Sequence, residues 1–449
     1  MLTSSKLALA GLLLAGCGAP PPRYSGRLTD WEQTNNERME SQDSEAALLV
    51  EGAGLTEILR HARAHNPGLE AALQRWKAAL EKVPGATTLA NPRVTLGGFL
   101  SEVETRVGPM QARVGVAQPL PWFGKLRLAG EVQFAAAEEA RELLEAALLE
   151  LDQRARAAWY EYAWLERAIV ITGGNRDLLI HWESVARARL SSGLGSYADV
   201  IRAQVELGKL EDRAQSLNDL RGPIVASLNA ALNRPSASAL PRPTGPLPDP
   251  PSINGEQLAA SLHQTNPILR ALGHRIEGAR QGVELASKAF YPDFAVGVDY
   301  TLIGSAKASG VSGSGDDAFA LTLGVELPIW RQSYRAGVRG AEARTRAAQA
   351  EQVEATNRLK SELEMTLYQF RDAGRRVVLF RDSLIPKGEE VIQTLDAGYQ
   401  AGDESFLSLI DAQRVLLEFQ LQAARAESDR MMALAMTERI IGTPLQQER

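Results

Sequence analysis

Residues 399–414 read YQAGDESFLSLIDAQR, and residues 190–204 read LSSGLGSYADVIRAQ, which is a weaker copy of the same stretch. The two glycines that these stretches share, Gly193 and Gly402, lie 209 positions apart. In each stretch one Ala/Leu-rich run ends at a glycine and a second run begins a few residues later, which is the pattern of a turn between two helices. The chain therefore contains two helical hairpins that are related by an internal duplication.

The duplication extends to the N-terminal side of both hairpins. Asn66-Pro67 and Asn266-Pro267, which are 200 positions apart, each open an apolar-periodic segment with a capping asparagine and a proline at the first helical position. Pro92 and Pro292 each begin a stretch of alternating polarity. Each copy thus reads helix, strand, strand, very long helix, turn and long helix. This order predicts a mixed α+β protein that is part β-barrel and part helical tube.

Four segments of the sequence alternate as membrane-crossing strands do. With their flanking residues the segments are about 9–11 residues long, which is the length that a tilted strand needs to cross the hydrocarbon core. We expect the apolar residues to face lipid and the small or polar residues, including Asp299 and Glu326, to face a water-filled lumen. A soluble antiparallel sheet with one buried face would show the same local pattern. The four segments are Val94–Leu100, Ala112–Gln118, Phe294–Leu302 and Phe319–Leu327.

Two runs rich in Ala, Leu, Glu and Arg, at about residues 126–190 and 333–397, favour the membrane interpretation. As helices they would each extend about 100 Å. Globular domains seldom use helices of this length, whereas helical tubes do. Gly173-Gly174 in the first run and Pro386 in the second predict a bend or an interruption at similar depth.

The N-terminus has the pattern of a bacterial lipoprotein signal. A short apolar run, Leu7–Leu14, is followed by Ala15-Gly16-Cys17. The run is too short to span a bilayer and is typical of a secretory signal, and small residues before a lone cysteine resemble a lipobox. We therefore expect cleavage before Cys17 and acylation of Cys17 by lipid such as palmitate, and Gly18 at the next position favours the outer membrane. An ordinary signal peptide with a buried cysteine is the alternative.

The composition excludes several classes of function. With a net charge of −6 at pH 7, the 449-residue chain is too acidic for a nucleic-acid-binding protein. Nucleophile elbows, phosphate-binding glycine loops and metalloprotease motifs are absent from the sequence, so we expect neither an enzyme nor a cofactor. His61 and His65 lie one helical turn apart, but no further cluster of ligands completes a metal site. Beyond the signal there is no apolar stretch of about 18 residues or more, so if the mature chain crosses a membrane it must do so with strands.

The number of strands predicts the assembly. Four strands cannot close a barrel, and an open sheet edge is not tolerated in lipid. Two chains would pool eight strands, whose interior is filled by side chains, whereas three chains would pool twelve and leave room for a channel. We therefore expect a homotrimer in which a twelve-stranded barrel is continued by a helical barrel.

The predicted domain boundaries follow the duplication. Residues 234–252 are rich in proline and read as an extended connector between the two repeats. The full assignment is a lipoprotein signal peptide (1–16), a lipidated N-terminal tether (17–52), the first structural repeat (53–233), the connector (234–252), the second structural repeat (253–445) and a C-terminal tail (446–449).

With these features the chain resembles the TolC-type outer-membrane efflux family over residues from about 50 to 445. The resemblance rests on the order of the duplicated motifs and most clearly on residues 399–414. Residues 118–125, QPLPWFGK, are similar to the CzcC-like, heavy-metal branch of that family, which is associated with RND transporters. The resemblance implies a homotrimeric outer-membrane channel with a long periplasmic α-helical barrel. It also implies two partners, a periplasmic adaptor and an inner-membrane transporter.

The resemblance also implies candidate site residues. The helical tube of the family closes near the hairpin turns, where the motif places Asp411 and Tyr399 in the second copy and Asp199 in the first. A carboxylate repeated by threefold symmetry makes a like-charge ring, which favours cations and resists closure. The alternative is that Asp199 and Asp411 are solvated acids near helix N-termini. The candidate adaptor-docking residues lie at the exposed turns and are Gly193, Leu194, Gly402 and Asp403.

We therefore expect an exit duct of a tripartite efflux system, which passively conducts substrates from the periplasm to the exterior. Its substrates would be metal cations or small toxic compounds. Two alternatives stay open. One is a type I protein-secretion channel with the same architecture, and the other is a non-conducting structural or adhesive coiled-coil lipoprotein.

Overall fold

The structure is a computed structural model that describes residues 19–45, 53–243 and 245–445. The predicted signal peptide (1–16), the predicted lipidation site Cys17 and the predicted C-terminal tail (446–449) lie outside these residues. The chain divides into two compact units. Unit 1 contains the described residues up to Glu32 together with Gln74–Arg141 and Ala271–Val353. Unit 2 contains Gln33–Leu73, Glu142–Arg270 and the chain from Glu354 onward.

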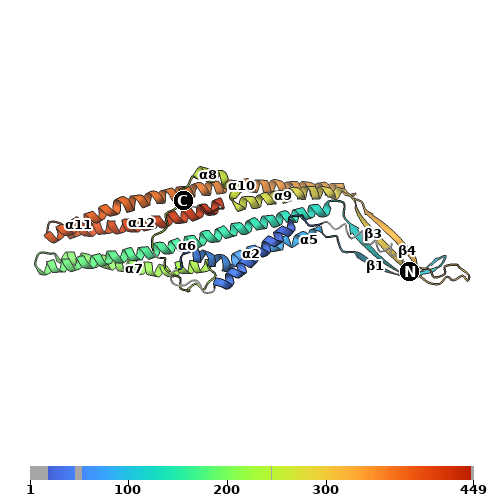
Figure 1. The fold of residues 1–449 in the computed structure, drawn as a ribbon, viewed down its shortest axis with the longest axis horizontal. Coiled ribbons are helices and arrows are strands. Elements are labelled where there is room, and N and C mark those ends of the chain that lie inside the picture. Colours follow the sequence, from blue (N-terminus) through green and yellow to red (C-terminus); the bar gives the residue numbers. More distant parts are fainter. Residues whose placement is uncertain (1–18, 46–52, 244, 446–449) are drawn as a thin grey trace. The chain divides into compact units, whose positions relative to one another are not determined.

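Unit 1 contains one antiparallel sheet of four strands in the order β1-β2-β3-β4. The four predicted strands are therefore confirmed. Strands β2 and β3, one from each repeat, pair at the centre of the sheet, and β1 and β4 are its edges within the described residues. The strands are β1 (Arg93–Thr105), β2 (Gly108–Leu120), β3 (Asp293–Ile303) and β4 (Ala318–Glu326) (Figure 1).

The register of the sheet separates its residues into two chemically different faces. Asp299 lies directly opposite Gly115 on β2 and Ala320 on β4, so these small and polar residues share one face. The other face carries aliphatic and aromatic side chains, among them Leu96 and Leu321, which are 75% and 76% exposed. A face of large, exposed apolar side chains is typical of strands that contact lipid.

Two long helical hairpins follow the strands of the two repeats. The first is formed by α6 (Lys125–Ser191) and α7 (Tyr197–Ala231). The 67 residues of α6 correspond to a length of about 100 Å. The second hairpin has a composite outward arm and a single return helix. It consists of α10 (Arg331–Leu379), the π-helical turn η2 (Phe380–Leu384), α11 (Ile385–Ala401) and α12 (Phe406–Ile441) (Figure 1).

The outward arms of the two hairpins differ in their interruptions. Pro386 lies in the first turn of α11, directly after the π-helical turn, so the predicted interruption is present in the second repeat. Gly173 and Gly174 lie inside α6, which is not interrupted there. The two glycines cost the helix about 1–2 kcal/mol relative to alanine, whereas proline also removes a hydrogen-bond donor and clashes with the preceding turn. The change of helix type therefore lies beside Pro386 and not at the two glycines.

Shorter helices precede the strands of each repeat. In each repeat an Asn-Pro pair separates two of these helices, α3 from α4 and α8 from α9. Helix α2 lies within the predicted tether (17–52), and its polar sequence has no apolar stripe that would indicate a helix. The bounds are α2 (Tyr24–Glu45), α3 (Leu55–His65), α4 (Pro67–Leu80), α5 (Lys82–Thr87), α8 (Gly255–Thr265), α9 (Pro267–Ser287) and the 3-10 turn η1 (Lys288–Phe290).

The side chain of Asn66 joins three helices of the first repeat. Its oxygen accepts hydrogen bonds from the backbone N–H groups of Gly68 (2.9 Å) and Leu69 (3.2 Å), which caps α4 as predicted. Its amide nitrogen donates to the carbonyl oxygen of Ala231 (3.0 Å), the last residue of α7. The junction of α3 and α4 is thereby bonded to the end of the first hairpin.

Asn266 repeats this arrangement in the second copy. Its oxygen accepts a hydrogen bond from the backbone N–H of Leu269 (3.1 Å) in α9, and its amide nitrogen donates to the carbonyl oxygen of Ile440 (2.7 Å) near the end of α12. Each structural repeat is therefore closed on itself by one asparagine.

Acidic side chains of α6 bind arginines of the shorter helices in both units. Glu138, Glu142 and Asp152 are all buried, and each has an arginine partner, so their charges are compensated. The short helices are thereby fastened to the long one. The pairs are Arg27–Glu138 and Arg275–Glu139 in unit 1, and Arg270–Glu142 and Arg63–Asp152 in unit 2.

The two hairpins pack around a shared apolar core in unit 2. Trp182 of α6 and Phe406 of α12 are almost completely buried, together with Val200 of α7 and Ile392 of α11. Each large side chain that is removed from water contributes about 2 kcal/mol. The core thus holds all four helices together near the turns. Within the described residues, the helices include none that is both long and apolar enough to cross a membrane.

Candidate functional site

The turns of the two hairpins are built alike. Gly193 (φ 73°) and Gly402 (φ 95°) adopt the left-handed conformation at the ends of α6 and α11, which a residue with a Cβ rarely adopts. Ser196 and Ser405 then cap α7 and α12, because each side-chain oxygen accepts a hydrogen bond from a backbone N–H at 3.1 Å. The same spacing of glycine and serine in both copies therefore produces the same turn.

The surfaces of the two turns differ in chemistry. The first turn exposes apolar side chains, because Leu194 is 72% and Tyr197 is 67% exposed. The second turn exposes the acidic Asp403 and Glu404. All four residues predicted for adaptor docking are exposed on these turns, namely Gly193, Leu194, Gly402 and Asp403.

Arg189, in the last turn of α6, links the two turns. Its guanidinium donates hydrogen bonds to the carbonyl oxygens of Tyr399 (2.6 Å), Gln400 (2.7 Å) and Leu194 (3.2 Å). It also lies over the Tyr399 ring, 4.9 Å from the ring centroid. A cation is favoured at the carbonyls of Tyr399 and Gln400 because they lie at the end of α11, where the helix dipole is negative. Arg189 thus bonds the first hairpin directly to the second.

Tyr399 is buried beneath this arginine. Its ring packs against that of Phe406, with 5.1 Å between the centroids, and its hydroxyl has no hydrogen-bond partner among the described residues. Burial raises the pKa of the Tyr399 hydroxyl, and the negative charge of Asp199 raises it further. Asp199 forms an ion pair with Arg202 (3.5 Å). The structure therefore places Tyr399 and Asp199 in the same electrostatic environment, at the end of the hairpins.

Asp411 belongs to a second link, between α7 and α12. Arg414 donates to Asp411 Oδ1 from Nη1 (2.9 Å) and to Glu206 Oε2 from Nε (3.0 Å). Lys209 also binds Glu206, at 2.8 Å. The hydrogen bonds from Arg414, and then those from Lys209, hold the pKa of the Glu206 carboxyl below its usual value. The charge of Asp411 is therefore compensated within its own chain.

Gln413, which the repeated motif places beside these residues, points into the core. It is 1% exposed, and its amide donates to Asn175 Oδ1 on α6 (3.1 Å). Asn175 in turn donates to Gln420 Oε1 (2.8 Å). Gln413 therefore has a structural role, since it fixes how α6 and α12 align.

In unit 1, the predicted lumen residues Asp299 and Glu326 lie on the small and polar face of the sheet. Asp299 is bound by both ends of the Arg113 guanidinium, with Nε–Oδ1 at 3.1 Å and Nη2–Oδ2 at 2.9 Å. Glu326 is exposed at the end of β4, opposite Asp293. The two acids therefore differ in charge compensation, because the carboxylate of Asp299 is paired with Arg113.

The segment 118–125 binds the end of β2 to the start of β3. Lys125 Nζ lies 2.8 Å from both carboxylate oxygens of Asp293, and the backbone N–H of Trp122 donates to one of them at 2.6 Å. The Trp122 ring stacks on Tyr291 and Phe294, with 5.2 Å and 5.8 Å between centroids. The structural role of this segment is thus to join the two repeats where strands give way to helices.

His61 and His65 do not form part of a metal centre in the described residues. Their rings stack at 4.1 Å, and no group of three or more His, Cys, Asp and Glu side chains in this part of the chain is placed to hold a metal ion. Burial, followed by the charges of His65 and Arg234, lowers the pKa of His61 to about 4. His61 is therefore neutral at physiological pH.

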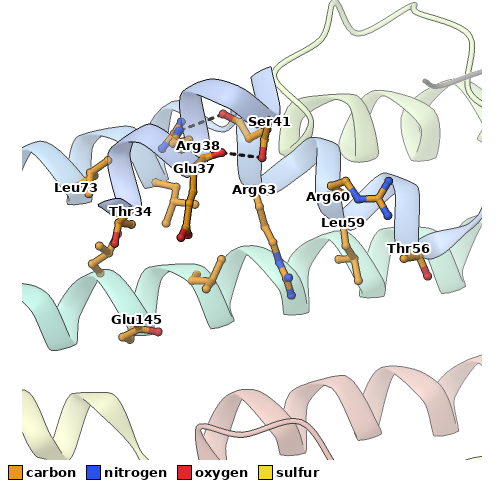
Figure 2. Close-up of a pocket in the computed structure, with 14 residues that line it drawn as sticks. Thr34, Glu37, Arg38, Ser41, Thr56, Leu59, Arg60, Arg63, Leu73 and Glu145 are labelled. Carbon is orange, nitrogen blue, oxygen red and sulfur yellow. Dashed lines mark hydrogen bonds between the residues drawn. The ribbon is translucent and has the colours of Figure 1, made fainter. Parts of the chain in front are cut away.

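A cavity of about 500 Å³ lies in unit 2 among α2, α3, α4 and α6 (Figure 2). Leucine side chains, including Leu59 and Leu73, form much of its wall. Arg63 extends from α3 toward α6 (Figure 2), where its Nε donates to Asp152 Oδ1 at 2.9 Å. Arg38 donates to the backbone carbonyls of Ala64 and Asn66. The guanidinium groups of Arg38 and Arg63 therefore both bind acceptors of this chain.

Three charged residues that form long-range links, Arg189, Arg113 and Glu206, were not predictable from the sequence. Arg189 and Arg113 bind groups that are 210 and 186 positions away, which no local pattern indicates. Glu206 is bound by Arg414 across 208 positions. The pair of Asp411 and Arg414 could have been found, because residues three apart face each other on a helix.

The sheet with one apolar face and the two long hairpins together define the class of outer-membrane channels. The crystal structure of VceC from Vibrio cholerae matches this chain with a TM-score of 0.71, at 18% identity, over 87% of this chain and 97% of that chain. The cobalt-zinc-cadmium resistance protein CzcC of Cupriavidus metallidurans is 22% identical over 396 residues, which are 86% of this chain and 90% of that protein. The outer membrane protein OprJ of Pseudomonas aeruginosa is 25% identical over 397 residues, which are 83% of this chain and 79% of that protein.

The outer membrane efflux protein family matches residues 58–234 and 258–443, which together make up more than half of the chain. The chain therefore belongs to this family. Because the match has two parts, one in each half of the chain, it also confirms the internal duplication. The protein is an outer-membrane efflux channel with a periplasmic helical extension, and it is a transporter rather than an enzyme.

Proposed function

We propose that three copies of this chain form the exit duct of a tripartite efflux system, together with a periplasmic adaptor and an inner-membrane transporter. The observation that carries the proposal is the open sheet. Within the described residues β1 and β4 each pair on one side only, while the apolar face is exposed. Unpaired strand edges are not tolerated in lipid, and three such sheets joined edge to edge give a closed barrel of twelve strands that can hold a water-filled channel.

Metal cations are the substrates that the similarities favour, with RND-type transporters as the pump. The segment 118–125 resembles the CzcC-like branch. CzcC, which is named for cobalt, zinc and cadmium resistance, aligns with 86% of this chain at 22% identity. The similarity to OprJ keeps small toxic compounds as the second substrate class.

The exposed turns are the proposed docking surface for the adaptor. Leu194 and Tyr197 on the first turn offer an apolar contact, and Asp403 on the second offers an acidic one. Apolar groups at this level of exposure gain free energy when a partner covers them.

The same end of the hairpins is the proposed periplasmic gate, formed by Asp411, Tyr399 and Asp199. Two links hold the hairpins together there, namely Arg189 on the carbonyls of Tyr399 and Gln400, and Glu206 with Arg414 and Asp411. The helices of a tube can separate at its end only if such links open, so these contacts favour the narrow state.

Acylated Cys17 is the proposed anchor in the outer membrane. It rests on the run of small residues before the lone cysteine. Growth with radiolabelled palmitate tests it, because Cys17→Ser is expected to abolish labelling. Labelling of the variant at the level of the unmodified protein would reject acylation at this position.

The main proposal is tested with purified protein and with a deletion strain. Native mass spectrometry is expected to give three chains, and planar bilayers are expected to show conductance. Deletion of the gene is expected to increase sensitivity to cobalt, zinc and cadmium salts. A trimer that does not conduct would favour the structural or adhesive lipoprotein, and a deletion that blocks only protein export would favour a type I secretion channel.

A further inference from the structure

The centre of the sheet carries one pair of opposite charges on its small and polar face. Arg113 of β2 grips both carboxylate oxygens of Asp299 on β3, at 3.1 Å and 2.9 Å. The residues directly opposite Arg113 on the adjoining strands are Gly97 and Thr301, and those opposite Asp299 are Gly115 and Ala320. The pair therefore lies in a band whose other members are small and uncharged.

The glycines in this band leave the space that the side chain of Asp299 occupies. A Cβ on Gly115 would overlap the Asp299 carboxylate, so only glycine lets this side chain lie flat against β2. A Cβ on Gly297 would likewise come within 2.7 Å of Thr322 Oγ1. The carboxylate of Asp299 is thus held where Nε and Nη2 of Arg113 can each bind one of its oxygens.

We infer that Arg113 determines the charge preference at the middle of the barrel, because it cancels the carboxylate of Asp299 there. The inference rests on the proposed function, in which three chains place this face on a common lumen. Three bare carboxylates at one level of a pore would favour cations, whereas three compensated pairs leave little net charge. The middle of the barrel then contributes little charge preference of its own, and any preference depends on charges elsewhere, such as Glu326 at the end of β4.

A purely structural role for the pair makes a different prediction. If Arg113 only holds β2 to β3, its loss would lower stability and leave the charge preference of the pore unchanged. The reversal potential in a KCl gradient separates these roles, because it depends on the ratio of K⁺ to Cl⁻ permeability and is independent of the number of channels.

The experiment uses full-length trimers in planar bilayers. Arg113→Gln is expected to raise the ratio of K⁺ to Cl⁻ permeability by about threefold or more, and the isosteric Asp299→Asn to lower it, since each leaves one sign of charge uncompensated. The double variant is expected to return close to the unmodified channel. The matched control is Arg106→Gln, which removes the same charge from the β1–β2 turn, where Arg106 binds only the carbonyl of Ser312 among the contacts described.

Each outcome decides a separate point. Unchanged reversal potentials in Asp299→Asn and in any Arg113→Gln channel that forms would overturn the inference and leave the proposed function intact. An equal shift in Arg106→Gln would also overturn it, because position in the barrel would then not matter. Trimers that insert but never conduct would overturn the proposed function itself, and this inference with it.

Discussion

Asn66 and Asn266 each use both ends of a side-chain amide. The oxygen satisfies backbone donors at the start of a helix, and the nitrogen satisfies a carbonyl at the end of a distant one. Both groups would otherwise be buried without partners, which costs more than a hydrogen bond gains. One residue in each repeat therefore controls two helix ends at once.

Alanine at either position is expected to destabilise the protein. The cap contributes about 1 kcal/mol and the second hydrogen bond about 1 kcal/mol, so each variant is expected to lose about 2 kcal/mol. The loss should be larger for Asn266→Ala, because Asn266 is 1% exposed and Asn66 is 7% exposed. Thermal unfolding followed by circular dichroism measures the change. Asn66→Asp keeps the capping oxygen and loses the donor, so a variant as unstable as Asn66→Ala would contradict the division into two roles.

Arg189→Ala is expected to increase the conductance of the isolated channel, because it removes three hydrogen bonds that join the hairpins. Single-channel recordings measure the effect. Arg187→Ala is the matched control, since Arg187 pairs only with Glu183 of the same helix among the contacts described. Equal conductance in both variants would reject Arg189 as a link that narrows the tube.

At the scale of the element, local signals predicted much of the structure. The turns were predictable because glycine and serine determine the end of one helix and the start of the next within a few residues. The strands were predictable from alternation. Helix α2 was not predictable, because its buried anchor, Trp31, lies under Lys77 of a later helix. The continuity of α6 through Gly173 was also not predictable, since it depends on packing along the whole helix.

The link between α7 and α12 gives an expected pH dependence. The pKa of Glu206 lies below its usual value of 4.5 in the folded protein, so its contribution to stability is present above pH 4.5 and is lost as the pH falls through the lowered pKa. The melting temperature of the unmodified protein should decrease more than that of Glu206→Gln below pH 4.5. Melting curves at neutral and acidic pH measure this difference. An identical decrease in both proteins would show that Glu206 does not contribute.

At the scale of the whole molecule, the duplication, the four strands and the class of channel followed from the sequence, because repeats and alternation extend along the chain. The charged links did not follow. Arg113 and Asp299 come from different repeats, and their pairing depends on the register of β2 and β3. The candidate gate residues were placed by the motif. The ion pairs of Asp199 with Arg202 and of Asp411 with Arg414 each lie within one helix, whereas the link from Arg414 to Glu206 depends on how α7 and α12 pack. The sequence therefore did not indicate the long-range charge partners of these residues.

Neighbouring residues of β4 test which face of the sheet contacts lipid. Leu321→Lys is expected to reduce insertion into the outer membrane, because lysine on the lipid face costs about 2–4 kcal/mol near the bilayer midplane. Ala320→Lys places the same charge on the opposite face, beside Asp299, and should insert normally. The amount of trimer in outer-membrane fractions measures both. Equal insertion of the two variants would contradict the proposed orientation.

The closure of each repeat by its own asparagine bears on the ancestry of the chain. A polypeptide of half this length would already have contained two strands, one hairpin and the amide that ties its beginning to its end. Six such polypeptides arranged around an axis would supply the same twelve strands as three of the present chains. We therefore expect that gene fusion created this protein from a hexameric ancestor. The differences between its halves, such as the unbroken α6 and the π-helical turn before α11, are then later specialisations of subunits that were once identical.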